Sequence, residues 1–252
     1  MRITFLGTGT CHQQPDRATT AIDCDGWGTH FLIDVGSGAL RRLREAEINP
    51  DTIEAVFITH VHPDHLSDLP PLIQMYQYAL PAARTRTLHL FGPVGLNKTV
   101  GEMIRLMLPE AVGKMPFELA VHELGESEVD FGPVKVFSRT VAHSDHLKCL
   151  GYRFAAQKKT FAFTGDSGTC PALSELGKGV DLYIMECNNP SDQPVPGHLT
   201  PAQLASIAQE SQAKEIVLTH IGPLCAGRDL KEEAREFRGE ITVAEDLLEV
   251  KL

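Results

Sequence analysis

The segment THVHPDH, residues 59–65, constrains this chain more than any other segment. Its three histidines and one aspartate come directly after AVFIT, an apolar run typical of a buried strand. Imidazole and carboxylate groups are ligands that zinc and related metals prefer, and the end of a rigid strand fixes their geometry. A histidine-rich surface loop is the alternative, but the position at a strand end disfavours it. His60 and His62, two positions apart, can point toward one ion, and Asp64 and His65, past the turn, can reach a second, so the segment predicts ligands for two metal ions.

Four side chains cannot complete two metal sites, so further ligands must come from other segments. Three candidates lie at or just beyond predicted strand ends: His143 after VKVFSRTVA, Asp166 after TFAFTG and His220 after EIVLT. A single histidine at a strand end is structural at least as often as functional, but the shared position at strand ends strengthens the case that all three residues are metal ligands. His146 is an alternative to His143. We favour His143 because it directly follows its predicted strand.

The charge of the chain points away from long nucleic acids as partners. The net charge is −10, from 33 acidic and 23 basic residues, and no strong cluster of lysine and arginine stands out. The densest basic group, Arg41, Arg42 and Arg44, falls on a predicted helix beside Glu45 and Glu47, which is typical of a solvated helix face. We therefore expect a small substrate, although this charge is compatible with local basic pockets.

The length of 252 residues suffices for a sizeable core, and we expect a single hydrolase domain over residues 1–252. No apolar run approaches the ~20 residues that cross a bilayer, and the N-terminus lacks the features of a signal peptide. We therefore expect a cytoplasmic protein without membrane contact. The six cysteines are scattered without a C-x-x-C pair, so reduced thiols are expected and zinc–thiolate binding is unsupported.

Hydrophobic patterning predicts strands and helices in two successive halves. Strands are predicted at 2–6, 21–24, 29–34, 55–59, 87–91, 117–124, 134–141, 150–155, 160–164, 182–186, 216–219 and either 241–244 or 248–251. Helices are predicted at 38–46, 71–80, 94–108, 172–176, 201–210 and 230–237. Two β-rich halves decorated with helices predict an α/β fold, a four-layer αββα sandwich. The apolar stretch 70–80 reads as a core helix, with the interface of a homodimer as the alternative.

Eight segments occur in the order typical of one family and span Phe5 to Pro223: FLGTGT, LIDVGSG, THVHPDH, AHSDHLKCLGYRF, FTGDSG, MEC, GHLTPAQLA and VLTHIGP. With them the chain resembles the metallo-β-lactamase superfamily, and within it the ribonuclease Z-like branch. The resemblance implies the αββα fold and two divalent metal ions. Zinc is the expected metal, with manganese or iron as alternatives. One ion would be bound by His60, His62 and His143, the other by Asp64, His65 and His220, and Asp166 would bridge them.

The resemblance also implies roles around the metals. Asp34 would accept a hydrogen bond from a ligand imidazole, although it reads equally well as an ordinary cap of the following turn. Asp64 is expected to be catalytic as well as a ligand. His198 and Glu186 would form a catalytic pair that assists the leaving group, the alternative being that His198 supports the next helix. The glycines are expected in tight turns near the metals rather than in a phosphate-binding loop: Gly7, Gly9, Gly36 and Gly38.

Together these features predict a dinuclear metal-dependent hydrolase that uses a metal-bridging hydroxide, most simply a phosphodiesterase for small or cyclic phosphodiesters. Ribonuclease Z-like 3′ processing of RNA is one alternative, but those relatives carry a Gly-rich, basic arm after the strand matching GYRF, where this chain has only AAQKK. Aryl sulfatase or lactonase activity would use the same centre. A redox diiron protein is disfavoured because it would need a carboxylate in place of His62. A non-catalytic metal-binding scaffold is disfavoured because such relatives usually lose metal ligands, and none is missing here.

Overall fold

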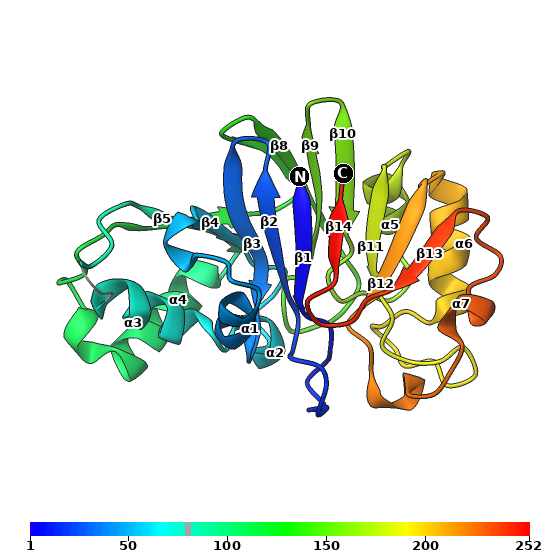
Figure 1. Ribbon diagram of the computed structural model, residues 1–252, viewed down its shortest axis with the longest axis horizontal. Coiled ribbons are helices and arrows are strands. Elements are labelled where there is room, and N and C mark those ends of the chain that lie inside the picture. Colours follow the sequence, from blue (N-terminus) through cyan, green and yellow to red (C-terminus); the bar gives the residue numbers. More distant parts are fainter. Residues whose placement is uncertain (79–81) are drawn as a thin grey trace.

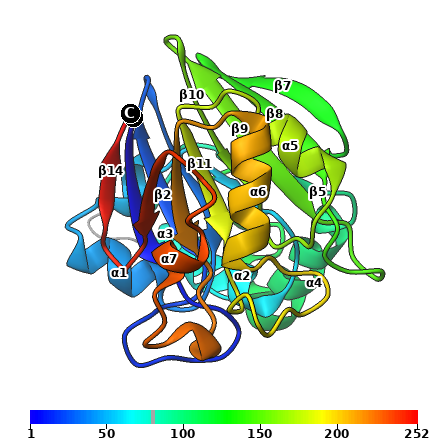
Figure 2. The same cartoon turned by 90° about the vertical axis from the view of Figure 1, so that its right-hand side faces the viewer.

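The structure, a computed structural model, describes residues 1–78 and 82–252. Two seven-stranded sheets pack face to face, and helices cover both outer faces (Figures 1 and 2). The predicted four-layer αββα sandwich is confirmed. Among the described residues, none of the helices combines the length and the apolar character that crossing a bilayer requires.

The first sheet has the strand order β14-β1-β2-β3-β4-β5-β6. Its strands are β1 (Arg2–Gly7), β2 (Ala21–Gly26), β3 (Thr29–Val35), β4 (Ala55–Phe57), β5 (Leu88–Pro93), β6 (Leu119–Leu124) and β14 (Glu249–Lys251). Its helices are α1 (Ala39–Glu45), α2 (Pro63–Leu66), α3 (Leu69–Tyr78) and α4 (Leu96–Met107).

The second sheet has the order β13-β12-β11-β10-β9-β8-β7. Its strands are β7 (Ser127–Phe131), β8 (Val134–Thr140), β9 (Leu150–Ala156), β10 (Lys159–Phe163), β11 (Leu182–Glu186), β12 (Glu215–Thr219) and β13 (Glu240–Val243). Its outer face is covered by α5 (Pro171–Gly177), α6 (Pro201–Ser211) and α7 (Leu230–Glu233).

Several details differ from the sequence prediction. Helix α2 forms where no helix was predicted, and β4 ends at Phe57 rather than at 59. Strand β7 was not expected, because SEVDF is mostly polar; it is an edge strand of the second sheet and pairs with β8. Helix α7 ends at Glu233 rather than at 237. Both candidate C-terminal strands form, β13 in the second sheet and β14 in the first, where β14 lies antiparallel to β1 and brings the two chain ends together (Figure 1).

Side chains that alternate along the strands fill separate cores. In β3, Leu32 packs toward the helices, whereas Phe31 and Ile33 pack between the sheets. Between the sheets, Phe154 of β9 stacks on Phe31 at 5.0 Å and meets the edge of Phe57 at 5.2 Å. These contacts lock the two sheets together.

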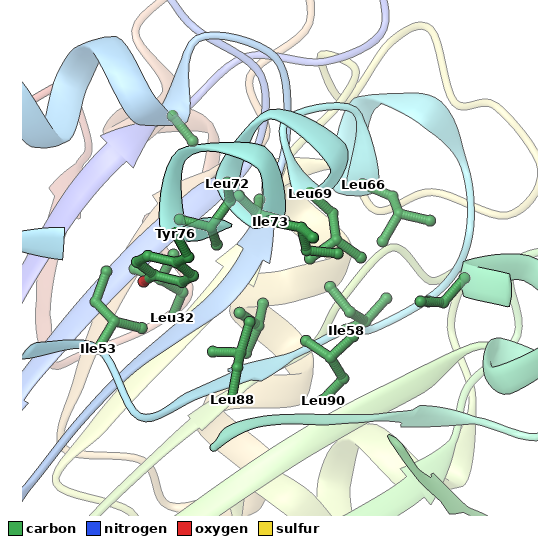
Figure 3. Packing of buried hydrophobic residues seen from close by; sticks show 14 of the residues in the cluster. Leu32, Ile53, Ile58, Leu66, Leu69, Leu72, Ile73, Tyr76, Leu88 and Leu90 are labelled. Carbon is green, nitrogen blue, oxygen red and sulfur yellow. The ribbon is translucent and has the colours of Figure 1, made fainter. Parts of the chain in front are cut away.

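Helix α3 packs on the first sheet through its buried residues (Figure 3). Tyr76 is fully buried and donates its hydroxyl to the Pro50 carbonyl at 2.7 Å. The core-helix interpretation of this stretch is therefore confirmed, although residues 79 and 80 of the predicted helix lie outside the described residues. A homodimer stays a prediction.

The parallel strands place functional segments at one edge of the sandwich. In the first sheet β3 runs parallel to β4, and in the second β10, β11 and β12 run parallel to one another. The segments that follow these strands meet near α2, at the lower edge of the molecule in Figure 1.

Candidate metal centre

The segment 59–65 leaves the first sheet after β4 and turns into helix α2. Pro63 occupies the first turn of this helix, where its missing N–H is not needed. His65 donates its backbone N–H to the His62 carbonyl at 3.0 Å, which closes the turn. The side chains of His60, His62, Asp64 and His65 thus project into one small region.

We call the residues Asp64, His65 and His220 the buried half of the centre and His60, His62 and His143 the outer half. Within the outer half, His62 Nδ1 lies 2.9 Å from His60 Nε2 and 3.1 Å from His143 Nε2. Tetrahedral zinc with bonds of 2.0–2.1 Å separates its ligand atoms by roughly 3.3 Å. The spacing therefore suits three ligands of one small cation.

Asp166 lies between the two halves, and its Oδ2 atom approaches imidazoles of both. The distance from Oδ2 to Nε2 is 3.2 Å for His220 and 3.3 Å for His65 in the buried half. It is 3.9 Å for both His60 and His143 in the outer half. The arrangement suits a carboxylate shared by two cations.

A buried aspartate supports the buried half from behind. Asp34 accepts hydrogen bonds from the backbone and hydroxyl of Thr59 at 2.7 and 2.8 Å, and its Oδ2 lies 2.7 Å from Nδ1 of His65. With Nδ1 of His65 engaged, Nε2 is the atom that faces Asp166. The expected hydrogen bond from a candidate ligand imidazole to Asp34 is therefore present.

Two candidate residues adopt the left-handed backbone conformation that side chains other than glycine rarely adopt. Asp34 has φ of 56° and His220 has φ of 53°. His220 is also held by the Thr20 hydroxyl, 2.7 Å from its Nδ1. Such conformations persist where surrounding contacts enforce them and are concentrated at functional sites. Nothing in the sequence near Thr20 signalled this role.

Electrostatics favour the neutral imidazole, which is ready to bind a cation, at three of the candidate ligands. Burial lowers the pKa of His60 and His62 and lowers the pKa of His220 to about 4. Burial would also lower the pKa of His65, but the charges of Asp166 and Asp34 raise it well above its usual value. These carboxylates thus strongly favour positive charge at the centre.

The donor set fits divalent metal ions. His65 Nε2 and Asp166 Oδ1 are buried side-chain atoms without a hydrogen-bond partner among the described residues. Buried polar atoms normally have partners, so both are suited to bind a cation or a molecule bound beside it. Imidazole and carboxylate donors together match zinc, manganese or iron.

His198 and Glu186 form a hydrogen-bonded pair beside the centre. His198 Nδ1 lies 2.9 Å from Oε1 of the fully buried Glu186. Burial raises the pKa of Glu186 to about 7, although the hydrogen bond from His198 lowers it. Burial would lower the pKa of His198, but the hydrogen bond and charge of Glu186 raise it above its usual value. The imidazole therefore holds a proton more firmly than an isolated histidine would.

His143, and not His146, lies among the candidate ligand side chains. His143 belongs to the outer half, and its Nδ1 donates to the Gly197 carbonyl at 2.9 Å. His146 is exposed and belongs to none of the candidate metal groups among the described residues. The preference for His143 agrees with this placement.

Gly36 lies where the backbone is tightly packed near the centre, in line with the tight turn expected there. A Cβ atom on Gly36 would collide with the Asp64 carbonyl and the Thr19 hydroxyl. Among the other predicted glycines, Gly38 has φ of 94° at the start of α1. Both therefore serve tight backbone geometry.

The centre opens into a cavity of about 240 Å³. Besides candidate ligands and His198, its walls include Cys11 and Asn188, which the sequence did not single out. The Asn188 amide nitrogen lies 3.5 Å from His198 Nδ1. All six cysteines are free, as expected, and Cys11 is the exposed one.

Residues 29–221 match the family described as a beta-lactamase superfamily domain. The chain is 26% identical to a ribonuclease Z from Pyrococcus horikoshii, an alignment that covers 98% of this chain and 94% of that protein. The crystal structure of human tRNase Z, short form, superposes with a TM-score of 0.81 at 25% identity, covering 100% of this chain and 99% of that one. The metallo-beta-lactamase fold protein YhfI from Bacillus subtilis superposes with a TM-score of 0.84 at 23% identity, covering 99% and 98% of the two chains.

Proposed function

This chain belongs to the metallo-β-lactamase superfamily, in its ribonuclease Z-like branch, and is a metal-dependent hydrolase; from this premise we propose that it cleaves small or cyclic phosphodiesters. The observation that carries the proposal is the convergence of candidate ligand atoms around Asp166 inside a small cavity. The proposed ligands are His60, His62 and His143 for one ion and Asp64, His65 and His220 for the other, with Asp166 shared. Zinc is the proposed metal.

Divalent ions bound there would lower the pKa of water and neutralise charge on phosphoryl oxygens. The chain's own residues then fix the reacting groups. Asp166 and the imidazoles set where the ions lie, and Asp34 orients His65. The entering oxygen of water bonds to phosphorus as one of the water protons is released to the surrounding solvent, and the bond to the leaving oxygen breaks with its electron pair. His198 supplies the proton that this oxygen takes up.

The walls of the cavity favour a diester over a monoester. None of the described residues that line it is a lysine or an arginine, so the metal ions and the protonated His198 would balance the charge of the substrate. A phosphodiester group carries one negative charge, whereas a phosphomonoester carries close to two at pH 7. The lower charge therefore matches this centre better.

The connection between β9 and β10 argues for a small substrate. Only Gln157 and Lys158 separate the strands, with φ of 50° and 64°, as in the tight turn of a two-residue hairpin. An RNA-gripping arm at this point would need an insertion that residues 150–163 do not contain. The net charge of −10 also disfavours a long phosphate backbone.

The test is turnover by metal-reconstituted protein of bis-p-nitrophenyl phosphate and of cyclic nucleotides, with p-nitrophenyl phosphate as the monoester control. We expect both kinds of diester to be hydrolysed faster than the monoester. Inertness toward both diesters, with metal bound, would contradict the proposal. Faster turnover of an aryl sulfate or a lactone in the same assay would point to another ester as the substrate of this centre.

A second candidate function is favoured by the relatives named ribonuclease Z, which match almost the whole chain. It is cleavage of RNA at a 3′ end by the same centre. A tRNA precursor with a 3′ trailer, incubated with the same preparation, tests it. Cleavage at one defined site, at a rate above that for the small diesters, would replace our first proposal.

A further inference from the structure

A second hollow, of about 400 Å³, adjoins the metal cavity. His198 is the one described residue that lines both spaces. The hollow is also lined by residues that include Thr169, Pro194, Val195, Pro196 and Gln203. We call this space the leaving-group hollow.

We propose that the leaving-group hollow binds the alcohol portion of the phosphodiester that departs, and that this portion is uncharged and has an apolar face, as in an aryl group or a nucleoside. The inference rests on the proposed phosphodiesterase function. It assigns a binding site and a substrate class to residues outside the metal centre.

The position of His198 gives the first argument. Its Nδ1 is engaged by Glu186 at 2.9 Å, so Nε2 is the ring atom left to donate a proton. A proton donor must come within about 2.6–3.2 Å of the oxygen it protonates. The group attached to that oxygen therefore extends from the edge of His198. The metal cavity itself must hold the ions and the phosphoryl group, so the adjoining hollow is the space that remains for the departing group.

The chemistry of the walls gives the second argument. Pro194, Val195 and Pro196 supply apolar surface. Gln203 accepts from the backbone N–H and the hydroxyl of Thr200 through its Oε1, which leaves its amide N–H groups to donate to a ligand. Of the described lining residues, only His198 is titratable, so a charged leaving group would lose hydration without gaining an ion pair.

The wall is also held in place before any ligand binds. His198 donates its backbone N–H to the Val195 carbonyl at 3.2 Å, and the Gly197 carbonyl accepts from His143 at 2.9 Å. Gly197 has φ of 82°, and a Cβ there would collide with the His143 carbonyl. Farther along the loop, Asp192 forms an ion pair with Arg228 at 2.9 Å. A preformed wall binds a ligand without a large ordering cost.

Another large space offers a contrast. A cavity of about 640 Å³ has charged walls that include Arg17, Arg228 and Lys231. Neither His198 nor any of the proposed metal ligands lines it. A charged group would find partners there, but it would not be attached to an oxygen that His198 can protonate.

The experiment compares two diesters that differ in the charge of the leaving group: methyl 4-nitrophenyl phosphate and its 3-carboxy-4-nitrophenyl analogue. The ratio of their kcat/KM values is measured for metal-loaded wild type, Val195→Lys and the control Leu224→Lys. Val195 and Leu224 are comparably exposed loop residues, at 43% and 52%, and Leu224 lines neither space. We expect wild type to prefer the uncharged leaving group, and Val195→Lys to shift the ratio toward the carboxylated one by about fivefold, the effect of one partly exposed ion pair.

An unchanged ratio in Val195→Lys, or an equal change in Leu224→Lys, would overturn the inference while phosphodiesterase activity stands. If wild type hydrolyses neither diester, the proposed function fails and the hollow is judged by binding alone. Thymidine binding to the metal-loaded protein, followed by ligand-observed NMR, is then decisive. Binding that is weakened by Val195→Lys but not by Leu224→Lys supports the hollow, and absence of binding to wild type overturns it.

Discussion

The two halves of the candidate metal centre are built differently. In the buried half, His65 is braced by Asp34 and His220 by Thr20, with atom separations of 2.7 Å in both cases. In the outer half, His60 is fully buried, with its Nδ1 3.1 Å from the Thr59 hydroxyl, whereas His62 and His143 are partly exposed and His143 is braced by the Gly197 carbonyl of a loop. Two ligands of the buried half are thus fixed by side chains within the sandwich, whereas the outer half depends in part on a loop.

This difference suggests a division of labour. Ligands that are oriented by buried hydrogen bonds lose little freedom when a cation binds, so the buried half should bind its ion more tightly. His62 and His143 of the outer half line the cavity with His198, where the substrate is proposed to react, and Asp64 and His220 of the buried half line it too. Asp166 is common to both halves, so changes there should not distinguish them. The predictions below test this division.

The largest effect is expected for Asp166→Ala. Because its Oδ2 atom approaches imidazoles of both halves, its removal should cost the centre both ions and lower turnover by about 10³-fold or more. His62→Ala, which affects the outer half alone, should retain one ion. Metal content by elemental analysis, together with kcat, checks both variants. An Asp166→Ala protein that keeps two ions and full turnover would refute the dinuclear centre.

Asp34→Ala should weaken metal binding in the buried half by about 10- to 100-fold, because His65 loses the partner that orients it. Competition with a chromophoric chelator measures the affinity. Asp23→Ala is the matched control, since it removes a fully buried carboxylate 2.6 Å from His30 in the same sheet. Equal losses of affinity in the two variants would mean that burial of charge, and not orientation of a ligand, explains the effect.

A smaller effect is expected on the pH profile of Glu186→Gln. Burial alone would lower the pKa of His198, and the Glu186 carboxylate outweighs burial and raises it. Without that charge His198 loses its proton at lower pH, so the alkaline limb of kcat should move to lower pH while metal content stays unchanged. An alkaline limb that does not move would show that His198 is not the proton donor.

The smallest effect is expected for His146→Ala, which should leave metal content and turnover within experimental error, because the side chain is exposed and outside the centre. His143→Ala should release the ion of the outer half. If His146→Ala, and not His143→Ala, lost metal, the geometry of the outer half would be wrong.

Much of this protein could be predicted from the sequence because local patterns carry the signal. Hydrophobic patterning and apolar runs predicted most strands, and the histidines of residues 59–65 marked the centre at a strand end. The fold class followed from the order of strands and helices. The polar strand β7 and the early end of α7 were not predicted, because the hydrophobic pattern of the sequence is weak at both places.

The sequence by itself determined which residue types gather at strand ends, and therefore the kind of chemistry the chain can perform. Only the tertiary structure decided which of them meet. It brought His143 but not His146 to the centre, joined β14 to the first sheet, and set Thr20 against His220, 200 positions away. The physical reason is that these contacts depend on how two sheets pack, and no local spacing encodes a hydrogen bond between residues so far apart in the chain.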